Sequence, residues 1–342
     1  MDAADVAQVA DSLRQALTCA PADADEVLTG FGWDELLDDE PRVAVSTLFP
    51  LCGELLTTGS ALDRVLLRAA GIEGLPPRTH VVLPALGGHR PSGRYDRRDT
   101  VNCDGVAQTG EGPLLVPCVD PQGELLFAVG GQVGVAEGNP IDPTAGWVRI
   151  RGTMPVHTVL DADALGEDPG QVWQRMLAAG RRALAYELVA VGTAMETMTV
   201  EHVRGRHQFG QSLGSFQAVK HQLADVHLWR AVAQLAAEAA WEDGGPDSAA
   251  LAKAAAVRCT KTARAVCQQL LGGMGFTWEH DFHRYLRRAL TLEPLLGGQA
   301  DLHAELGAAL RAGSISDSLA ALGQAEAVGQ HTDSKLQEEQ HA

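Results

Sequence analysis

Lysine, aromatic side chains and long apolar runs are scarce in this chain. Only four of its 342 residues are lysine, aromatic residues make up 5%, and 44 acidic residues face 27 basic ones for a net charge of −17. Phosphate backbones are bound by clustered Lys and Arg, so this balance excludes nucleic acid as an expected partner. No apolar run reaches the roughly 18 residues of a membrane span, and residues 1–15 lack the features of a secretion signal. We therefore expect a cytoplasmic protein with no membrane partner.

Signatures of disulfides, metal sites and nucleophilic catalysis are also missing. The six cysteines are spread out without a C-x-x-C pair, which indicates reduced thiols. Glu279, His280 and His283 lie close in sequence, but two histidines three positions apart without a third ligand favour structural roles. No G-x-S-x-G turn is present. We expect no metal site.

Three hydrophobic patterns follow one another along the chain. Residues 1–76 have apolar positions at helical spacing, residues 77–160 alternate short β-rich runs with Gly, Pro and Asp, and residues 161–312 form long helices. Residues 313–342 are polar, and we expect a disordered tail. The predicted fold is mainly α with a β domain: an N-terminal helical domain, a middle β-barrel-like domain and a C-terminal four-helix bundle. The β region is too short for a Rossmann domain.

Local signals place individual elements. We predict helices at about 44–58, interrupted by Pro50, and at 61–70, ended by Gly71. Strands are predicted at 81–84, 114–119, 125–129 and 147–150, with a turn at 120–123. After about residue 165 we predict three long helices. The first covers residues 171–204, and the second begins at an N-cap at Ser215. The third begins after the loop at residues 242–247 and ends at the pair Gly272-Gly273.

Two motifs in the helical half are more specific than periodicity. Residues 206–217 read R-H-Q-F-G-Q-S-L-G-S-F-Q and match R-x-x-F-G-x-x-[IL]-x-x-[FY]-Q. Residues 269–276 read Q-L-L-G-G-M-G-F and match Q-x-x-G-G-x-G-[FY]. Found in this order with a helical hairpin between them, they resemble the acyl-CoA dehydrogenase family over residues 175–298.

The resemblance implies an FAD site shared between two subunits. In the family, FAD lies between the β domain of one subunit and the helical domain of its neighbour, which contacts the pyrophosphate and adenosine end. The matching residues supply a guanidinium fork, apolar contacts, amides and close-approaching backbone: Arg206, Phe209, Leu213, Gln217, Gln269, Gly272 and Gly273. Taken singly, each also fits a solvated helix end or a helix C-cap; together they favour flavin binding.

The catalytic base of the family is missing at both positions where the resemblance places it. The reaction needs a carboxylate to remove the α-proton of an acyl thioester. The usual Glu-Gly position is Leu296-Gly297, and the alternative base before a conserved arginine is Gly180, with Arg181 matching that arginine as a substrate-site residue. Glu293 and Glu187 are nearby carboxylates, but helix spacing puts Glu293 almost one turn from Leu296, which disfavours a rescue role.

The predicted β domain departs from the family as well. The L-T-E-P…G-S-D stretch and the W-I-[TS] strand, which hold the flavin ring and substrate, have no counterpart in residues 81–160. The chain thus resembles the shortened, base-lacking subunit of actinobacterial acyl-CoA dehydrogenases of fatty-acid and steroid metabolism. That resemblance implies an α2β2 heterotetramer with a related subunit, shared FAD, an acyl-CoA thioester substrate and electron transfer to an electron-transfer flavoprotein.

Two alternatives stay open. One is a homo-oligomeric flavoprotein with a relocated base or redirected chemistry on an acyl thioester. The other is a structural protein that keeps the bundle for assembly and has lost flavin, although the joint retention of the two motifs argues against it.

Overall fold

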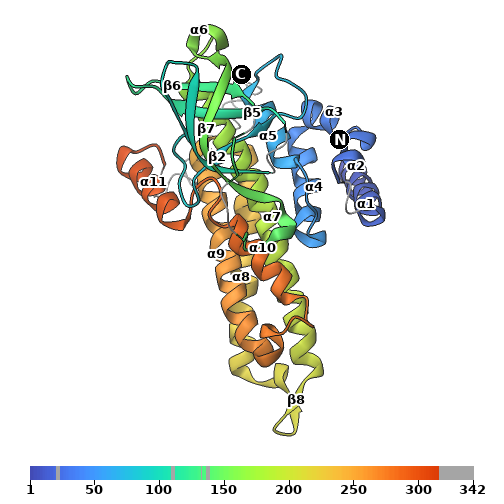
Figure 1. Cartoon of the computed structure of the whole chain (residues 1–342). Helices are drawn as coiled ribbons and strands as arrows, with labels where there is room; N and C mark the ends of the chain where they lie inside the picture. Colours follow the sequence, from blue (N-terminus) through green and yellow to red (C-terminus); the bar gives the residue numbers. More distant parts are fainter. Residues whose placement is uncertain (21–23, 109–111, 132, 136–138, 316–342) are drawn as a thin grey trace, which may run out of the picture. The chain divides into compact units, whose positions relative to one another are not determined.

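A computed structural model describes residues 1–20, 24–108, 112–131, 133–135 and 139–315 (Figure 1). It divides the chain into a compact unit, Met1–Leu302, and a second unit, His303–Ala342. The predicted class is confirmed: N-terminal helices, a β barrel and a C-terminal helical domain follow in that order. Most of the expected tail, residues 316–342, lies outside the described residues. No helix in the described ranges is long and apolar enough to cross a membrane.

Five helices form the N-terminal part: α1 (Ala3–Cys19), α2 (Ala24–Phe31), α3 (Trp33–Asp39), α4 (Pro41–Leu55) and α5 (Ala61–Ala70). Asp2 caps α1. Helix α5 ends at Gly71 with φ +66°, and this end was predicted. The predicted interruption at Pro50 is wrong, because α4 continues through it. Its neighbours Leu48, Phe49 and Leu51 are buried in the core, and that burial offsets the one helical hydrogen bond that proline cannot donate.

The middle region closes into a five-stranded barrel. The strands are β1 (His80–Val81), β2 (Leu83–Pro84), β3 (Gly93–Tyr95), β4 (Thr100–Gln108), β5 (Leu114–Val119), β6 (Leu125–Gly130) and β7 (Trp147–Leu160). The hydrogen-bonded order runs β5, β3, β4, β7, β6 and back to β5, with β1 paired to β5 and β2 paired to β4. The predicted turn between β5 and β6 is confirmed, because the Asp120 carboxylate accepts from the backbone N–H groups of Gln122 and Glu124.

The sequence prediction missed β3 and β4 and made β7 too short. Strand β4 carries Asn102, Asp104 and Gly105, which are typical of loops. Its buried face nevertheless alternates correctly, and Gly105 lets β2 approach, since a Cβ there would lie 2.2 Å from the Leu83 carbonyl oxygen. Tertiary pairing with the 14-residue β7 therefore overrides the local propensity of β4.

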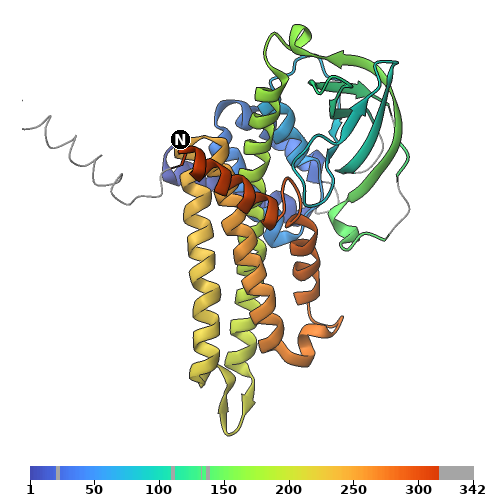
Figure 2. The same cartoon turned by 90° about the vertical axis from the view of Figure 1, so that its left-hand side faces the viewer.

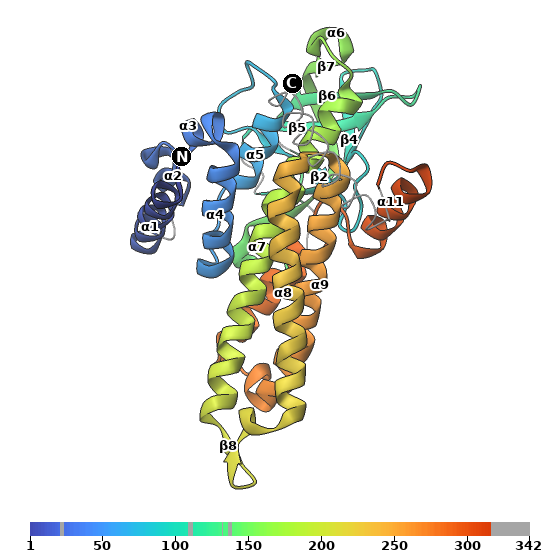
Figure 3. The ribbon, with the colours of Figure 1, turned by 180° about the vertical axis from the view of Figure 1, so that it is seen from behind.

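The helical part starts with the short α6 (Ala162–Leu165) and consists mainly of α7 (Pro169–Gly205), α8 (Gln217–Asp243), α9 (Pro246–Leu271) and α10 (Phe282–Leu292). The first three are long and lie side by side, and α10 is a short fourth member (Figures 2 and 3). The prediction that Ser215 is the N-cap of α8 is wrong. Phe216 precedes α8, and the Ser215 hydroxyl donates to the Ser212 carbonyl oxygen. Helix α11 (Gln299–Ala312) follows.

Candidate functional site

The two positions where the family resemblance places a base lie against each other. Gly180 belongs to α7, and Leu296 to the turn after α10. Leu296 is fully buried with φ +56°, a left-handed conformation uncommon for leucine. A Cβ at Gly180 would lie 2.4 Å from Leu296 Cδ1 and 2.9 Å from Leu66 Cδ2. The space between the two positions is therefore filled by apolar atoms.

Buried cations hold the turn that carries Leu296. Arg181 is fully buried, and its Nε donates to the Leu296 carbonyl oxygen at 3.0 Å. Lys253, on α9 and also fully buried, donates from Nζ to the carbonyl oxygens of Leu292 (3.3 Å) and Glu293 (2.9 Å). Carbonyls at a helix C-terminus carry partial negative charge, so the two cations fix this turn. A substrate contact for Arg181 stays a prediction.

The two nearby carboxylates have partners on the bundle helices. Glu293 Oε1 accepts from the Thr260 hydroxyl at 2.9 Å and lies 3.3 Å from Arg264 Nε. Glu187 forms an ion pair with Arg288 at 3.0 Å, and burial raises the pKa of its carboxyl while Arg288 opposes that rise. Neither carboxylate is placed by its hydrogen bonds beside Leu296. A relocated base therefore finds no direct support at these positions.

A loop of the barrel closes directly onto the same turn. The Gly87 N–H donates to the Pro294 carbonyl oxygen at 2.9 Å, and the Gly298 N–H donates to the Gly87 carbonyl oxygen at 2.9 Å. Two residues further on in that loop, the His89 carbonyl oxygen accepts from the Trp173 indole N–H at 3.3 Å. The β domain and the bundle are thus joined backbone to backbone beside Leu296.

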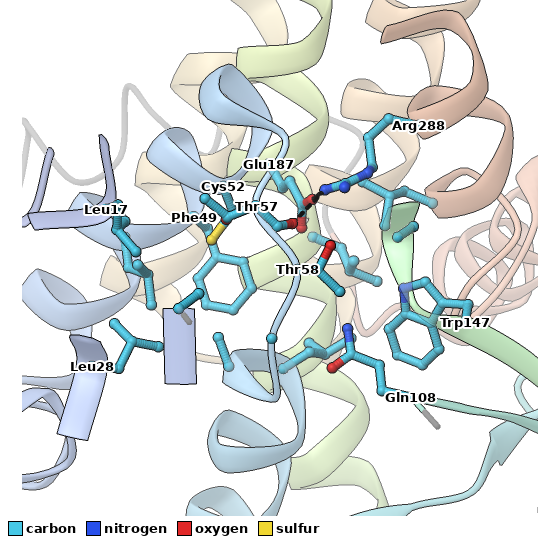
Figure 4. A pocket seen from close by; sticks show the side chains of 18 residues that line it. Leu17, Leu28, Phe49, Cys52, Thr57, Thr58, Gln108, Trp147, Glu187 and Arg288 are labelled. Atoms are coloured by element: carbon cyan, nitrogen blue, oxygen red, sulfur yellow. Dashed lines mark hydrogen bonds and ion pairs between the residues drawn. The ribbon is translucent and has the colours of Figure 1, made fainter. Parts of the chain in front are cut away.

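A small cavity lies between the N-terminal helices, the barrel and α7 (Figure 4). Its volume is about 30 Å³, enough for one or two water molecules, whereas ligand pockets measure roughly 300–1,000 Å³. Phe49 and Trp147 line it from two sides, with Gln108 and Thr58 between them. As it stands, this cavity is too small for an acyl chain.

Arg288 of α10 connects the three parts of the chain at the edge of this cavity. Its Nε lies 3.0 Å from Asp142, in the loop before β7, and its Nη1 lies 3.0 Å from Glu187 of α7. It also donates to the carbonyl oxygens of Leu56 and Thr57, which follow α4. The sequence pattern does not predict this network. The one signal for it was an arginine at a position of α10 that faces the core.

The first flavin motif forms an exposed hairpin at the far end of the bundle, beyond α7. Strands β8 (His207–Gln208) and β9 (Gln211–Ser212) carry Phe209 at the tip, 91% exposed with φ +53° (Figure 1). The Leu213 N–H donates to the Arg206 carbonyl oxygen at 2.8 Å, and the ring of Phe216 packs edge-on against Phe209. Among the described residues, the Arg206 guanidinium has no ion-pair partner.

The second motif lies near the same end. Gly272 is the C-cap of α9, with its N–H donating to the Gln268 and Gln269 carbonyls, and the short helix η4 (Gly272–Phe276) follows. Burial lowers the pKa of His202 at the end of α7, and the nearby charges of His280 and Arg206 lower it further. Arg206, which follows α7, and His280, which comes after the second motif, therefore both lie near His202. The apolar side chains exposed beside them are Met274, Phe276 and Trp278.

The geometry at this end fits the pyrophosphate and adenosine end of FAD. The Arg206 guanidinium, which pairs with no carboxylate in the part of the chain that the structure describes, suits phosphate. Exposed aromatic rings suit an adenine, and Gln269 is exposed, so its amide is available for hydrogen bonding. A Cβ at Gly272 or Gly273 would meet nothing within 4 Å, so a ligand can reach the backbone there. Gln217 begins α8 and is also exposed, whereas Leu213 is half-buried. Their roles in cofactor binding stay predictions.

His280 and His283 have structural partners. The Phe282 N–H donates to His280 Nδ1 at 3.1 Å, and His283 Nδ1 lies 2.8 Å from the His280 carbonyl oxygen. These bonds fix the start of α10. Among the described ranges, no group of three or more His, Cys, Asp or Glu side chains is placed to hold a metal ion.

Comparison with known families agrees with this geometry. Residues 170–309 match the model of the acyl-CoA dehydrogenase C-terminal domain. This part of the chain is similar to the C-terminal domain of the acyl-CoA dehydrogenase family. The similarity covers the bundle and both motifs. The N-terminal helices and the barrel agree with the family by fold.

Relatives and solved structures refine the comparison. Acyl-CoA dehydrogenases IpdE2 and FadE34 of Mycobacterium tuberculosis are 42% and 44% identical over 106 and 119 residues, covering 31% and 32% of this chain. The chain spans 33% and 17% of the length of these relatives. The Tcur3481-Tcur3483 steroid acyl-CoA dehydrogenase variant aligns with a TM-score of 0.72 at 21% identity, over 91% of this chain and 99% of its own. The ChsE4-ChsE5 complex from Mycobacterium tuberculosis gives 0.69 at 19%, over 91% and 98%.

Replacing Lys253 by methionine should change how stability depends on pH. Burial, with the nearby Arg181 charge, lowers the pKa of Lys253 to about 7. Between pH 7 and about 10 the unfolded chain then holds more protons at this lysine, so the free energy of unfolding of the parent chain rises with pH. The free energy of unfolding of Lys253→Met, measured with urea, should lack this part of the rise with pH. Lys261→Met on the same helix is the control, and an equal pH profile in both variants would contradict the assignment.

Proposed function

We propose that this chain is the non-catalytic subunit of a heteromeric, FAD-dependent acyl-CoA dehydrogenase. Arg206 and the bundle-end residues complete the flavin site of a related subunit, whose β domain holds the ring and whose carboxylate removes the α-proton. FAD, when bound, accepts the β-hydrogen as hydride. The overall reaction is α,β-dehydrogenation of an acyl-CoA thioester, with electrons passing to an electron-transfer flavoprotein. The proposed assembly is α2β2.

The contact between Gly180 and Leu296 is the observation that carries this proposal. Both positions for a base are apolar, and they fill each other's space. Neither position offers a carboxylate to remove an α-proton, and side-chain atoms of Leu66 and Leu296 occupy the space beside Gly180. The family chemistry therefore needs a carboxylate from another chain.

The exposed bundle end supports the second half of the proposal. Phe209 is 91% exposed, and the Arg206 guanidinium has no ion-pair partner among the described residues. This is an unusual surface for a monomer, and it suits a ligand held from the opposite side. The Tcur3481-Tcur3483 and ChsE4-ChsE5 structures, named for two proteins each, share the fold. The cavity beside Arg288, of about 30 Å³, is itself too small for an acyl chain.

The test compares the chain alone with the chain co-expressed with a related subunit that carries the Glu-Gly-Thr/Ser stretch. Flavin absorbance and mass in solution are measured for both preparations. We expect a colourless chain alone and a yellow complex with one flavin per pair of chains. A chain that is yellow and tetrameric by itself would overturn the proposal and favour the homo-oligomeric flavoprotein with a different base.

Restoring a carboxylate at the base position should not create an active enzyme. We expect Leu296→Glu, without a partner chain, to show no acyl-CoA turnover with an artificial electron acceptor, because the flavin-ring contacts are still missing. The buried carboxylate should also destabilise the fold by a few kcal/mol. Leu296→Gln, of similar shape and without charge, is the control for folding. Measurable dehydrogenation by Leu296→Glu alone would refute the half-site argument.

A further inference from the structure

A buried carboxylate joins helix α5 to the first strand of the barrel. Asp63 of α5 is 1% exposed, and its Oδ2 lies 2.7 Å from Nδ1 of His80 on β1. Its other oxygen, Oδ1, accepts from the Val81 N–H at 3.1 Å. Figures 1 and 3 show α5 beside the barrel. One side chain of the N-terminal helices therefore bonds to both a side chain and the backbone of β1.

Alternate backbone N–H groups at β1 point to different partners. The His80 N–H donates to the Pro113 carbonyl oxygen and the Val82 N–H to the Leu115 carbonyl oxygen, each at 2.9 Å, so both belong to the barrel. The Val81 N–H lies between them and donates to Asp63 instead. Protection of the Val81 N–H from solvent therefore reports the contact with α5, and protection of the Val82 N–H reports the barrel itself.

The other charged groups near this pair add negative charge or are paired elsewhere. Asp25 of α2 lies close enough to act on both Asp63 and His80. Arg64 follows Asp63 on α5, but its guanidinium pairs with Asp25 at 3.4 Å and with Asp34 at 2.8 Å. Strand β5 carries no acidic or basic side chain, and the acidic residue of β4 pairs with an arginine of β7. His80 is therefore the group that balances the charge of Asp63.

We propose that Asp63 and His80 form a proton-dependent clasp between α5 and the barrel, closed while the pair shares a proton and opening when that proton leaves. In the closed clasp an imidazolium faces the buried carboxylate. Loss of the proton leaves Asp63 as a buried anion beside Asp25 with a neutral imidazole opposite, which is unfavourable in a buried position. Separation of α5 from β1 relieves this, because water then reaches the carboxylate.

Raising the pH should open the clasp. The hydrogen bond to Asp63 raises the pKa of His80 above its ordinary value of 6.5, although burial opposes the rise, and burial raises the pKa of Asp63. Both groups therefore hold protons more tightly in the closed clasp than in the open one, where they face water. The stability that His80 contributes is complete below about pH 6.5 and is lost as the pH rises through its raised pKa.

The helix that the clasp holds also fills the space beside Gly180. Side-chain carbons of Leu62 and Leu66, both on α5, would lie 3.7 and 2.9 Å from a Cβ at Gly180. The clasp therefore fixes the position of these two leucines through the residue between them in sequence, Asp63. This inference does not rest on the proposed function, because it concerns how α5 is held and needs no flavin or partner chain.

Amide hydrogen exchange of the full chain, followed by NMR at single residues, tests the clasp. After correction for the intrinsic exchange rate, protection of the Val81 N–H should fall by about tenfold or more between pH 6.5 and about pH 9, because opening exposes it. Protection of the Val82 N–H should stay unchanged, since its partner is Leu115 of the barrel. Equal losses at both amides would mean that the barrel itself unfolds, and would overturn the proposal.

Two variants and a matched control separate the proton from other causes. His80→Gln should lower the protection of the Val81 N–H at pH 6.5 and remove its pH dependence. Asp63→Asn keeps an oxygen for the Val81 N–H but carries no charge, so protection should persist and again be independent of pH. His157→Gln, at an exposed histidine of β7, should behave like the parent chain. A pH dependence that survives in either clasp variant, or that is absent from the parent chain, would overturn the proposal.

Discussion

Replacing Arg288 by alanine should lower the free energy of unfolding by about 3–5 kcal/mol. The guanidinium is almost fully buried and lies 3.0 Å from carboxylate oxygens of both Asp142 and Glu187. Its loss leaves two buried carboxylates without a cation and two carbonyl oxygens, of Leu56 and Thr57, without a donor. Because a single uncompensated buried charge costs several kcal/mol, this change should rank among the most damaging in the chain.

Chemical unfolding of the chain checks this prediction, with Arg284→Ala as the control. Arg284 is on the same helix, and its 3.5 Å ion pair with Asp281 is exposed, so its removal should cost at most about 1 kcal/mol. Adding Glu187→Gln and Asp142→Asn to an Arg288→Met chain removes the uncompensated charges and should recover part of the loss. An Arg288→Ala chain as stable as the Arg284→Ala chain would show that the network is not needed for stability.

The helices were predictable because their signals are local. Apolar spacing, the Gly71 cap and the Gly272-Gly273 end all act within a few residues, and the structure places these helix ends within one or two residues of the prediction. Strand β4 was not predictable in this way, because Asn102 and Asp104 resemble loop residues and only pairing with β7 makes them a strand.

The same difference between local signals and long-range contacts applies to the candidate site. Each of the two motifs is contiguous in sequence, so the sequence alone singles out Arg206 and Gln269 as candidate site residues. The contact of Gly180 with Leu296 joins residues 116 positions apart, and the Arg288 network joins three parts of the chain. Such contacts depend on how helices pack, which periodicity does not specify.

Arg206→Ala should weaken FAD binding by the proposed complex on the order of 10- to 100-fold, because a charge-assisted hydrogen bond to phosphate contributes about 1.5–3 kcal/mol. Flavin content after dialysis, followed by absorbance, measures the effect in the co-expressed complex. The chain itself should fold normally, since the Arg206 side chain has no ion-pair partner among the described residues. Arg206→Lys keeps the charge without the planar fork and should give an intermediate loss.

Arg204 provides a matched control on the same helix end. It is exposed and two residues from Arg206, and α-helical geometry turns it about 200° away from that position. Arg204→Ala should therefore retain flavin if Arg206 acts through direct contact with the pyrophosphate. Equal losses in both variants would mean that only the general positive charge of the bundle end matters. Full flavin occupancy in Arg206→Ala would remove the shared-site assignment, because no other described cation in either motif is placed to replace this guanidinium.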